Sequence, residues 1–180
     1  RGRVPTRVPV VLDVEEVGRV LGQLEGVHRL IGLLLYGSGL RLLECLELRV
    51  KDVDLMRQEI RVRRGKGQKD RVTLLPEAAA GQLGEHLIRV KLMHDKALAA
   101  GTGGVVLPGA LARKYPRADR SWPWQWVFPA RQTYADPDTG EMRRHHLHPS
   151  AVQRAVAEAV RRSGVGKRAS CHTFRHSFAT

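Results

Sequence analysis

The sequence predicts a mainly helical α+β fold that contains a small β-hairpin or three-stranded sheet. Apolar residues recur at helical spacing through most of the first 100 positions and again near the C-terminal end. Two short runs between residues 59 and 74 instead alternate apolar and polar residues, which is typical of strands. With 180 residues, 42% of them hydrophobic, the chain is long enough for one domain with a sizeable core.

Three helices are expected in the first 48 residues. The first begins after Asp13, because Asp13 and Glu16 have the spacing of a capping box. The second covers about Val27–Tyr36, and the glycines at 37 and 39 end it. A third helix is expected over Leu40–Leu48, where leucines again occupy one face.

A β-hairpin is expected next. The alternating runs Glu59–Arg63 and Asp70–Leu74 flank a glycine-containing turn that places Lys66 at the tip. Val53–Leu55 is a candidate third strand. Pro76 then opens a long helix that reaches about residue 99.

Residues 101–149 show no clean periodicity, although they contain all three tryptophans of the chain. A stretch of this length without regular structure is usually functional or disordered, and the tryptophans argue against disorder. A helix returns over Ser150–Ser163, and a final helix opens at His172.

The charge of the chain points to a polyanionic partner. Lys and Arg number 31 against 18 Asp and Glu, a net charge of +13. Residues 57–71 and 142–180 together carry 12 of these 13 charges, a concentration that favours phosphate binding over general solubility. No apolar run of 18 residues is present, and the basic helix over 150–163 is too weakly apolar for a membrane anchor. Two distant cysteines are typical of a reducing compartment.

Several basic residues are candidates for an anion site. Arg41 follows a glycine turn at a helix start, where backbone amides and a guanidinium can bind phosphate together. His172 and Arg175 share one helix face at i, i+3 spacing. No metal site is expected, because Thr173 stands where a His-Glu-x-x-His zinc motif needs glutamate.

Three motifs in order resemble the catalytic domain of tyrosine recombinases, the phage integrase family. They are Gly39-Leu40-Arg41-Leu42-Leu43-Glu44, Gly65-Lys66-Gly67-Gln68-Lys69-Asp70-Arg71 and His172-Thr173-Phe174-Arg175-His176. The resemblance implies that fold, a DNA partner and phosphoryl transfer without metal or cofactor. It implies that Arg41 and Arg175 clamp the scissile phosphate. Lys66, rather than Lys69, would protonate the leaving 5′-oxygen, and His172 would assist.

The resemblance also implies a partial catalytic domain over residues 1–180. The family's nucleophilic tyrosine lies C-terminal to the His-x-x-Arg motif, whereas Tyr36, Tyr115 and Tyr134 all precede it. The nucleophile segment and the N-terminal DNA-clamping domain are therefore expected outside this sequence, and this chain alone is expected to be inactive. The full-length protein would act as a tetramer on paired sites in the bacterial cytoplasm.

Residues 101–149 resemble the extra insertion of integron integrases, which grips extrahelical bases of folded single-stranded sites. The segments that carry the resemblance are 107–116, the tryptophan cluster 122–126, 136–140 and 144–146. It implies that Trp124, His145 and His146 stack on a flipped base, with Pro137 as a weaker wall. Arg144 and Lys69 are further DNA-binding candidates.

Besides a chemically similar type IB topoisomerase, which the insertion disfavours, two alternatives remain open from the sequence. One is a generic phage-type tyrosine recombinase with an unrelated insertion, which would prefer duplex DNA. The other is a non-catalytic nucleic-acid-binding module, which explains the charge but not the ordered set of Arg41, Lys66, His172 and Arg175.

Overall fold

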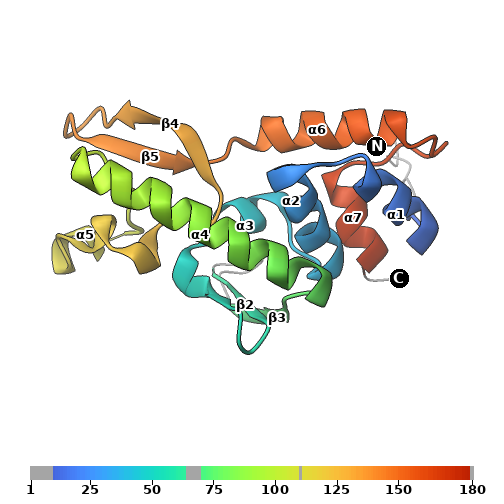
Figure 1. Cartoon of the computed structure of the whole chain (residues 1–180), viewed down its shortest axis with the longest axis horizontal. Coiled ribbons are helices and arrows are strands. Elements are labelled where there is room, and N and C mark those ends of the chain that lie inside the picture. The colour runs from blue at the N-terminus through green and yellow to red at the C-terminus, as the bar shows by residue number, and fades with distance from the viewer. Residues whose placement is uncertain (1–9, 64–69, 110, 179–180) are drawn as a thin grey trace, which may run out of the picture.

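The computed structural model of the chain describes residues 10–63, 70–109 and 111–178, so Lys66 and Lys69 lie outside the described residues. The described part is mainly helical, as predicted, and carries two small antiparallel sheets (Figure 1). The α-helices are α1 Val14–Gly22, α2 Gly26–Gly37, α3 Leu42–Leu46, α4 Glu77–Ala99, α5 Leu111–Lys114, α6 Pro149–Arg162 and α7 Cys171–Phe178. Short 3₁₀ turns are η1 Val50–Asp52, η2 Ala118–Arg120 and η3 Trp122–Trp124.

The predicted three-stranded sheet is confirmed. Its strands β1 (Val53–Asp54), β2 (Glu59–Val62) and β3 (Arg71–Leu74) lie in that order and pair antiparallel. Ile60 pairs with Thr73, so the buried Ile60 and Val62 point to the core. This register fixes which β3 side chains face α3.

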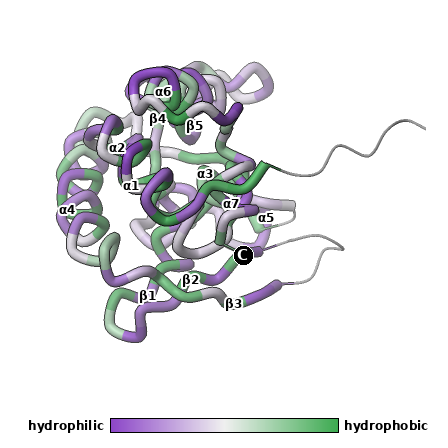
Figure 2. Tube along the Cα trace, turned by 90° about the vertical axis from the view of Figure 1, so that its right-hand side faces the viewer, coloured by the Kyte–Doolittle hydropathy of each residue, from purple (hydrophilic) through white to green (hydrophobic). Residues whose placement is uncertain are grey.

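The core centres on α2, which packs against α7, α4, α6 and α1. Ile31, Leu34 and Leu35 of α2 are fully buried, and Phe174 of α7 is almost so. Figure 2 shows hydrophilic and hydrophobic segments alternating along the outer helices α4 and α6, as expected of helices with one buried face. In the described part of the chain, no helix is both long and apolar enough to span a membrane. The cysteines are free and buried.

The capping box at α1 is confirmed, and it joins distant parts of the chain. Asp13 accepts a hydrogen bond from Glu16 N at 2.8 Å, and Glu16 accepts one from Asp13 N at 2.9 Å. Glu16 also binds the Lys167 ammonium at 2.6 Å. Next to it, Leu12 N donates a buried hydrogen bond of 2.9 Å to Ser177 Oγ in α7. The start of the described chain is therefore fixed to the last helix.

The helix predicted over Leu40–Leu48 is wrong in extent, because α3 covers only Leu42–Leu46. Arg41 is the extended N-cap residue rather than part of the helix. At the other end, the Leu48 carbonyl accepts a hydrogen bond of 2.9 Å from Val127 N. The chain leaves the helix there to pair with the segment around residue 126.

The expectation that residues 101–149 lack regular structure is also wrong. Strands β4 (Pro129–Ala135) and β5 (Met142–His146) form an antiparallel hairpin. No alternation of apolar and polar residues predicts this hairpin, because β4 is partly exposed on both faces and the register shifts between Pro129 and Thr133. The hairpin, α5, η2 and η3 lie at the end of the molecule opposite α1 and α7 (Figure 1).

Two histidines of α4 hold this region to the helical core. His86 Nε2 lies 2.7 Å from the Val127 carbonyl and His94 Nε2 lies 3.1 Å from the Arg120 carbonyl. The tryptophan segment is thus fixed from two sides, by α4 and by the chain after α3.

The predicted helix over 150–163 is confirmed as α6, with His148 as its N-cap.

Gly39 predicts a measurable stability effect. Its φ is +61°, and an added Cβ would lie 2.5 Å from a Phe178 ring carbon. Gly39→Ala should lower the free energy of unfolding by about 1–3 kcal/mol through backbone strain and this clash. Urea unfolding checks it. Gly18→Ala is the matched control: Gly18 lies in α1 with open space around it, so alanine should stabilise by about 0.5–1 kcal/mol. Equal effects of the two would contradict the prediction.

Candidate functional site

One carboxylate, that of Glu44 in α3, gathers three arginines. Arg41 donates to it twice, from the backbone N at 2.7 Å and from Nη1 at 2.7 Å. Arg71 of β3 forms a bidentate pair with both oxygens, each at 2.9 Å. Arg175 of α7 reaches Oε2 from Nη1 at 3.4 Å. Residues 134 positions apart in the sequence therefore share one anchor.

The ionised state of Glu44 is strongly favoured. Its side chain is only 10% exposed, and burial by itself would raise the pKa. The hydrogen bonds from Arg71 and from the Arg41 backbone and side chain outweigh burial and lower the pKa of Glu44 to about 2. Three guanidiniums against one carboxylate leave a local positive charge that suits a phosphate.

A cavity of about 210 Å³ opens beside this cluster and is lined by Arg41, Arg175 and His172. Leu40, Leu42, Gln153, Ser170 and Cys171 complete its lining. Burial, and then the nearby charges of Arg175 and Arg41, lower the pKa of His172. The imidazole is therefore neutral near pH 7 and can accept or donate a proton. Among the described residues, no group of three or more His, Cys, Asp or Glu could hold a metal ion.

Local sequence explains how each group reaches the cavity. The left-handed Gly39 reverses the chain after α2, so that Arg41 caps α3 in an extended conformation. The apolar side of α7, Cys171 and Phe174, is buried, which leaves His172 exposed on the cavity side. The structure thus brings together Arg41, His172 and Arg175, three of the four residues expected to be catalytic. The fourth, Lys66, lies outside the described residues.

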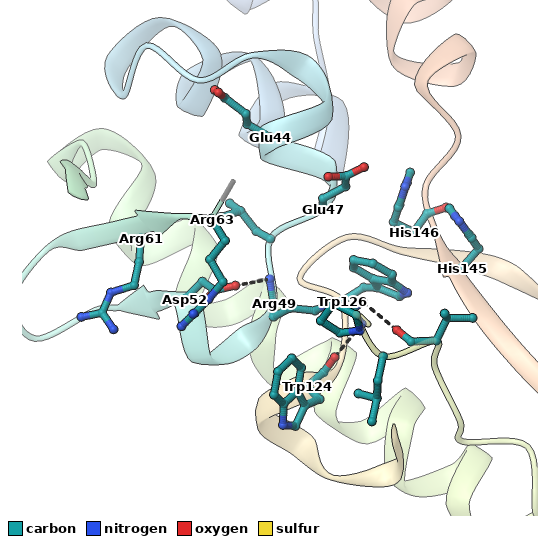
Figure 3. A pocket seen from close by; sticks show the side chains of 14 residues that line it. Glu44, Glu47, Arg49, Asp52, Arg61, Arg63, Trp124, Trp126, His145 and His146 are labelled. Carbon is teal, nitrogen blue, oxygen red and sulfur yellow. Dashed lines mark hydrogen bonds and ion pairs between the residues drawn. The ribbon is translucent and has the colours of Figure 1, made fainter. Parts of the chain in front are cut away.

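A second cavity, of about 310 Å³, lies between α3, β2 and the 101–149 region (Figure 3). Trp124, His145 and His146, expected to stack on a base, all line it. His145 is exposed, whereas His146 is buried and meets the Trp126 ring edge-on with ring centroids 5.2 Å apart. The Lys51 ammonium lies 3.1 Å from the centroid of the half-buried Trp124 ring.

Of the other DNA-binding candidates, the two that the structure describes line neither of these cavities. Pro137 is exposed in the turn between β4 and β5 and lines neither cavity. Arg144 also lines neither, and its Nη1 donates to the carbonyls of Ala130 and Arg131 at 2.7 and 2.6 Å. Lys69 lies outside the described residues.

Sequence reasoning missed three residues that organise the site. Glu44 was part of a motif but had no assigned role, although its position three residues after a helix N-cap is a capping signal. Arg71 depends on the β2–β3 register, and no sequence signal assigns it to Glu44. Arg49, a buried arginine in the second cavity, carries no motif at all.

The arginine cluster and the cavity beside it give this fold a positively charged site whose chemistry suits an anion. Comparison with known families identifies its kind: the sequence model of the Phage integrase family matches residues 11–180. The chain belongs to the phage integrase family.

Relatives from several prokaryotes agree with this membership. An integrase/recombinase of Escherichia coli is 52% identical over 180 residues, all of this chain and 53% of that protein. An integrase/recombinase of Pseudomonas aeruginosa matches to the same extent. Tyrosine recombinase XerA of Thermococcus kodakarensis is 46% identical over 88 residues, 47% of this chain and 31% of that protein. The chain spans about half the length of the first two relatives.

Solved structures show the same fold. XerA recombinase superposes with a TM-score of 0.64 at 22% identity over 99% of this chain and 51% of that one. The Tn1549 transposon integrase, in complex with circular intermediate DNA, gives a TM-score of 0.63 at 16% identity over 97% of this chain and 54% of that one. The predicted tyrosine recombinase catalytic-domain fold is confirmed.

The Glu44 cluster predicts a distinctive acid response. Because its pKa is lowered from 4.5 to about 2, the Glu44 pairs stabilise the fold above pH 4.5, and this contribution is lost as the pH falls toward 2. Glu44→Gln should lower the free energy of unfolding at pH 7 by about 3 kcal/mol, since it leaves guanidiniums without a counter-charge. Its loss of stability between pH 4.5 and 2 should be smaller than that of the parent. Urea unfolding at several pH values measures both.

The matched control for this prediction is Glu158→Gln. Glu158 also pairs with an arginine, Arg161, but its side chain is 49% exposed on α6. Solvent and salt screen exposed pairs, which contribute little to stability, so this variant should follow the parent closely at every pH. If Glu44→Gln behaved like Glu158→Gln, the carboxylate would not be the anchor of the arginines.

Proposed function

We propose that this chain is the greater part of the catalytic domain of a site-specific recombinase that breaks and rejoins DNA strands. The observation that carries the proposal is the convergence of Arg41 and Arg175 on Glu44 beside a cavity that His172 also lines. A net charge of +13 supports a DNA partner. The Tn1549 transposon integrase, which has the same fold, is bound to DNA in its solved structure.

The proposed reaction is phosphoryl transfer without a metal. A tyrosine oxygen attacks the scissile phosphorus, the bond to the 5′-oxygen breaks, and a 3′-phosphotyrosyl link forms. Attack by the 5′-hydroxyl of a partner strand reverses the step and restores the tyrosine. Both steps concentrate negative charge on the non-bridging oxygens, which Arg41 and Arg175 would neutralise from two sides.

The remaining roles follow from the chemistry of each group. The neutral His172 would hydrogen-bond the phosphate or help to deprotonate the nucleophile. Lys66 would protonate the leaving 5′-oxygen, a role for which Lys69 is the less favoured candidate. Tyr36, Tyr115 and Tyr134 do not line the arginine cavity, so the nucleophile is proposed to come from a segment beyond this sequence. On this proposal the 180-residue chain alone does not cleave DNA, and the full-length protein acts as a tetramer on paired sites.

The finer proposal is that the protein integrates gene cassettes in the manner of integron integrases. Support comes from the 310 Å³ cavity, which Trp124, His145 and His146 line together. Flat rings around a cavity favour an unpaired base, since any base can stack on an aromatic ring. Folded single-stranded sites are thus proposed as substrates beside duplex DNA.

The roles proposed for Arg41 and Arg175 predict that a substitution of Arg175 slows DNA cleavage but leaves DNA binding intact. In the full-length protein, Arg175→Lys should lower the rate of covalent protein–DNA adduct formation on a nicked suicide substrate by about 10²–10³-fold, because the bidentate donor to the transition state is lost. The affinity for the same DNA should change by less than about threefold, since other phosphate contacts remain. Gel analysis of adducts and a binding titration measure the two.

Arg162→Lys, a change to an exposed arginine of α6, is the control and should cleave like the parent. A parental rate for Arg175→Lys would contradict the clamp. A DNA affinity lost in parallel with cleavage would assign Arg175 to DNA binding rather than to the chemical step. A full-length parent that forms no adduct at all would favour a non-catalytic binding module.

The aromatic cavity predicts a substrate-selective effect. Trp124→Ala should weaken binding to a folded hairpin with extrahelical bases by about tenfold, since base stacking is lost. Binding to the linear duplex of the same sequence should stay within about twofold. Competition titration measures the ratio. Equal losses on both substrates would favour a generic duplex recombinase instead.

A further inference from the structure

The aromatic cavity depends on one buried cation, Arg49, which follows α3 directly. Arg49 is 8% exposed, and its guanidinium lies 3.1 Å from the centroid of the Trp126 ring. Nη1 donates to the Trp124 carbonyl and Nη2 to the Val106 carbonyl, each at 2.8 Å (Figure 3). These acceptors belong to two separate segments of the 101–149 region, so a single side chain from the core holds both.

The surroundings of Arg49 fix its orientation. Its backbone N donates to Asp52 Oδ2 at 3.2 Å, and Asp52 is held in turn by Arg63 at 2.5 Å. Arg49 also forms a β-bridge with Trp126. Burial lowers the pKa of Arg49 to about 10, although the negative charges of Asp52 and Glu47 act to raise it. Arg49 therefore stays a cation at neutral pH.

The chemistry explains why the position needs arginine. A planar guanidinium can stack on an indole and donate in its own plane to two separate acceptors at the same time. A lysine ammonium is a point charge that cannot combine both. Without the two hydrogen bonds from the guanidinium, the Trp124 and Val106 segments lose their common link, and the cavity between them loses its defined walls.

We propose that Arg49 is a positioning residue that determines specificity for unpaired bases. It fixes the Trp124 and Val106 segments around the 310 Å³ cavity, so that a nucleobase can enter the cavity and stack on rings that line it. This inference rests on the base-binding part of the proposed function. Arg49 lies in the core, outside the 101–149 region, and on this proposal it controls what that region binds.

The test uses the full-length protein and two DNA hairpins of equal length, one with a single unpaired 2-aminopurine and one fully paired. The parent should quench the unpaired 2-aminopurine and bind that hairpin more tightly by about tenfold. Arg49→Lys should reduce this preference to less than about twofold and lose the quenching, while its affinity for the paired hairpin stays parental. A merely structural role would weaken both hairpins equally.

Arg120→Lys is the matched control, because Arg120 is an exposed arginine of the same region with only a 4.0 Å contact to Asp119. It should keep the full preference. Arg49→Lys with an undiminished preference would overturn the role of Arg49 alone. A parent without any preference would overturn the base site itself and leave the cleavage proposal standing.

A second measurement covers the case in which Arg49→Lys does not fold. The parent is irradiated with the hairpin whose unpaired base is 5-iodouracil, and the crosslinked residue is mapped by mass spectrometry. Adducts on Trp124, Trp126 or His145 support the proposal. Adducts confined to residues outside the cavity overturn it.

Discussion

The Glu44 carboxylate is the interaction on which the rest of the site depends. It accepts hydrogen bonds from Arg41, Arg71 and Arg175, which come from the N-cap of α3, from the small sheet and from the last helix. Each arginine would repel the others without it, since three like charges share one small region. The carboxylate converts this repulsion into a fixed geometry and still leaves a net positive charge for a phosphate.

Much of the fold and part of the site could be predicted from the sequence, for identifiable reasons. The capping box at Asp13, the hairpin alternation and the i, i+3 pair His172 and Arg175 are local patterns, and all three appear in the structure. The end of α3 and the β4–β5 hairpin could not be predicted, because pairing with distant segments decides them. The roles of Arg71 and Arg49 could not be predicted for the same reason, because their hydrogen-bond partners lie 27 or more residues away in the sequence.

The two cavities are joined by a very short element. Helix α3 has five residues, and Arg41 precedes it while Arg49 follows it closely. Glu44 lies on the lining of the aromatic cavity as well as at the centre of the arginine cluster. A tilt of this one turn would change both cavities together, so the base selection and the phosphate binding proposed for the two cavities would be coupled.

The buried hydrogen bond from Leu12 to Ser177 joins residues 165 positions apart, and Ser177 lies two residues after Arg175 in α7. With the Lys167–Glu16 pair beside it, the segment that leads into α1 is fixed both to α7 and to the chain that precedes α7. A pull on the polypeptide at its first described residues is therefore transmitted through this hydrogen bond to α7, the helix of His172 and Arg175. Tension at the first described residues would therefore displace His172 and Arg175, the groups proposed to bind phosphate.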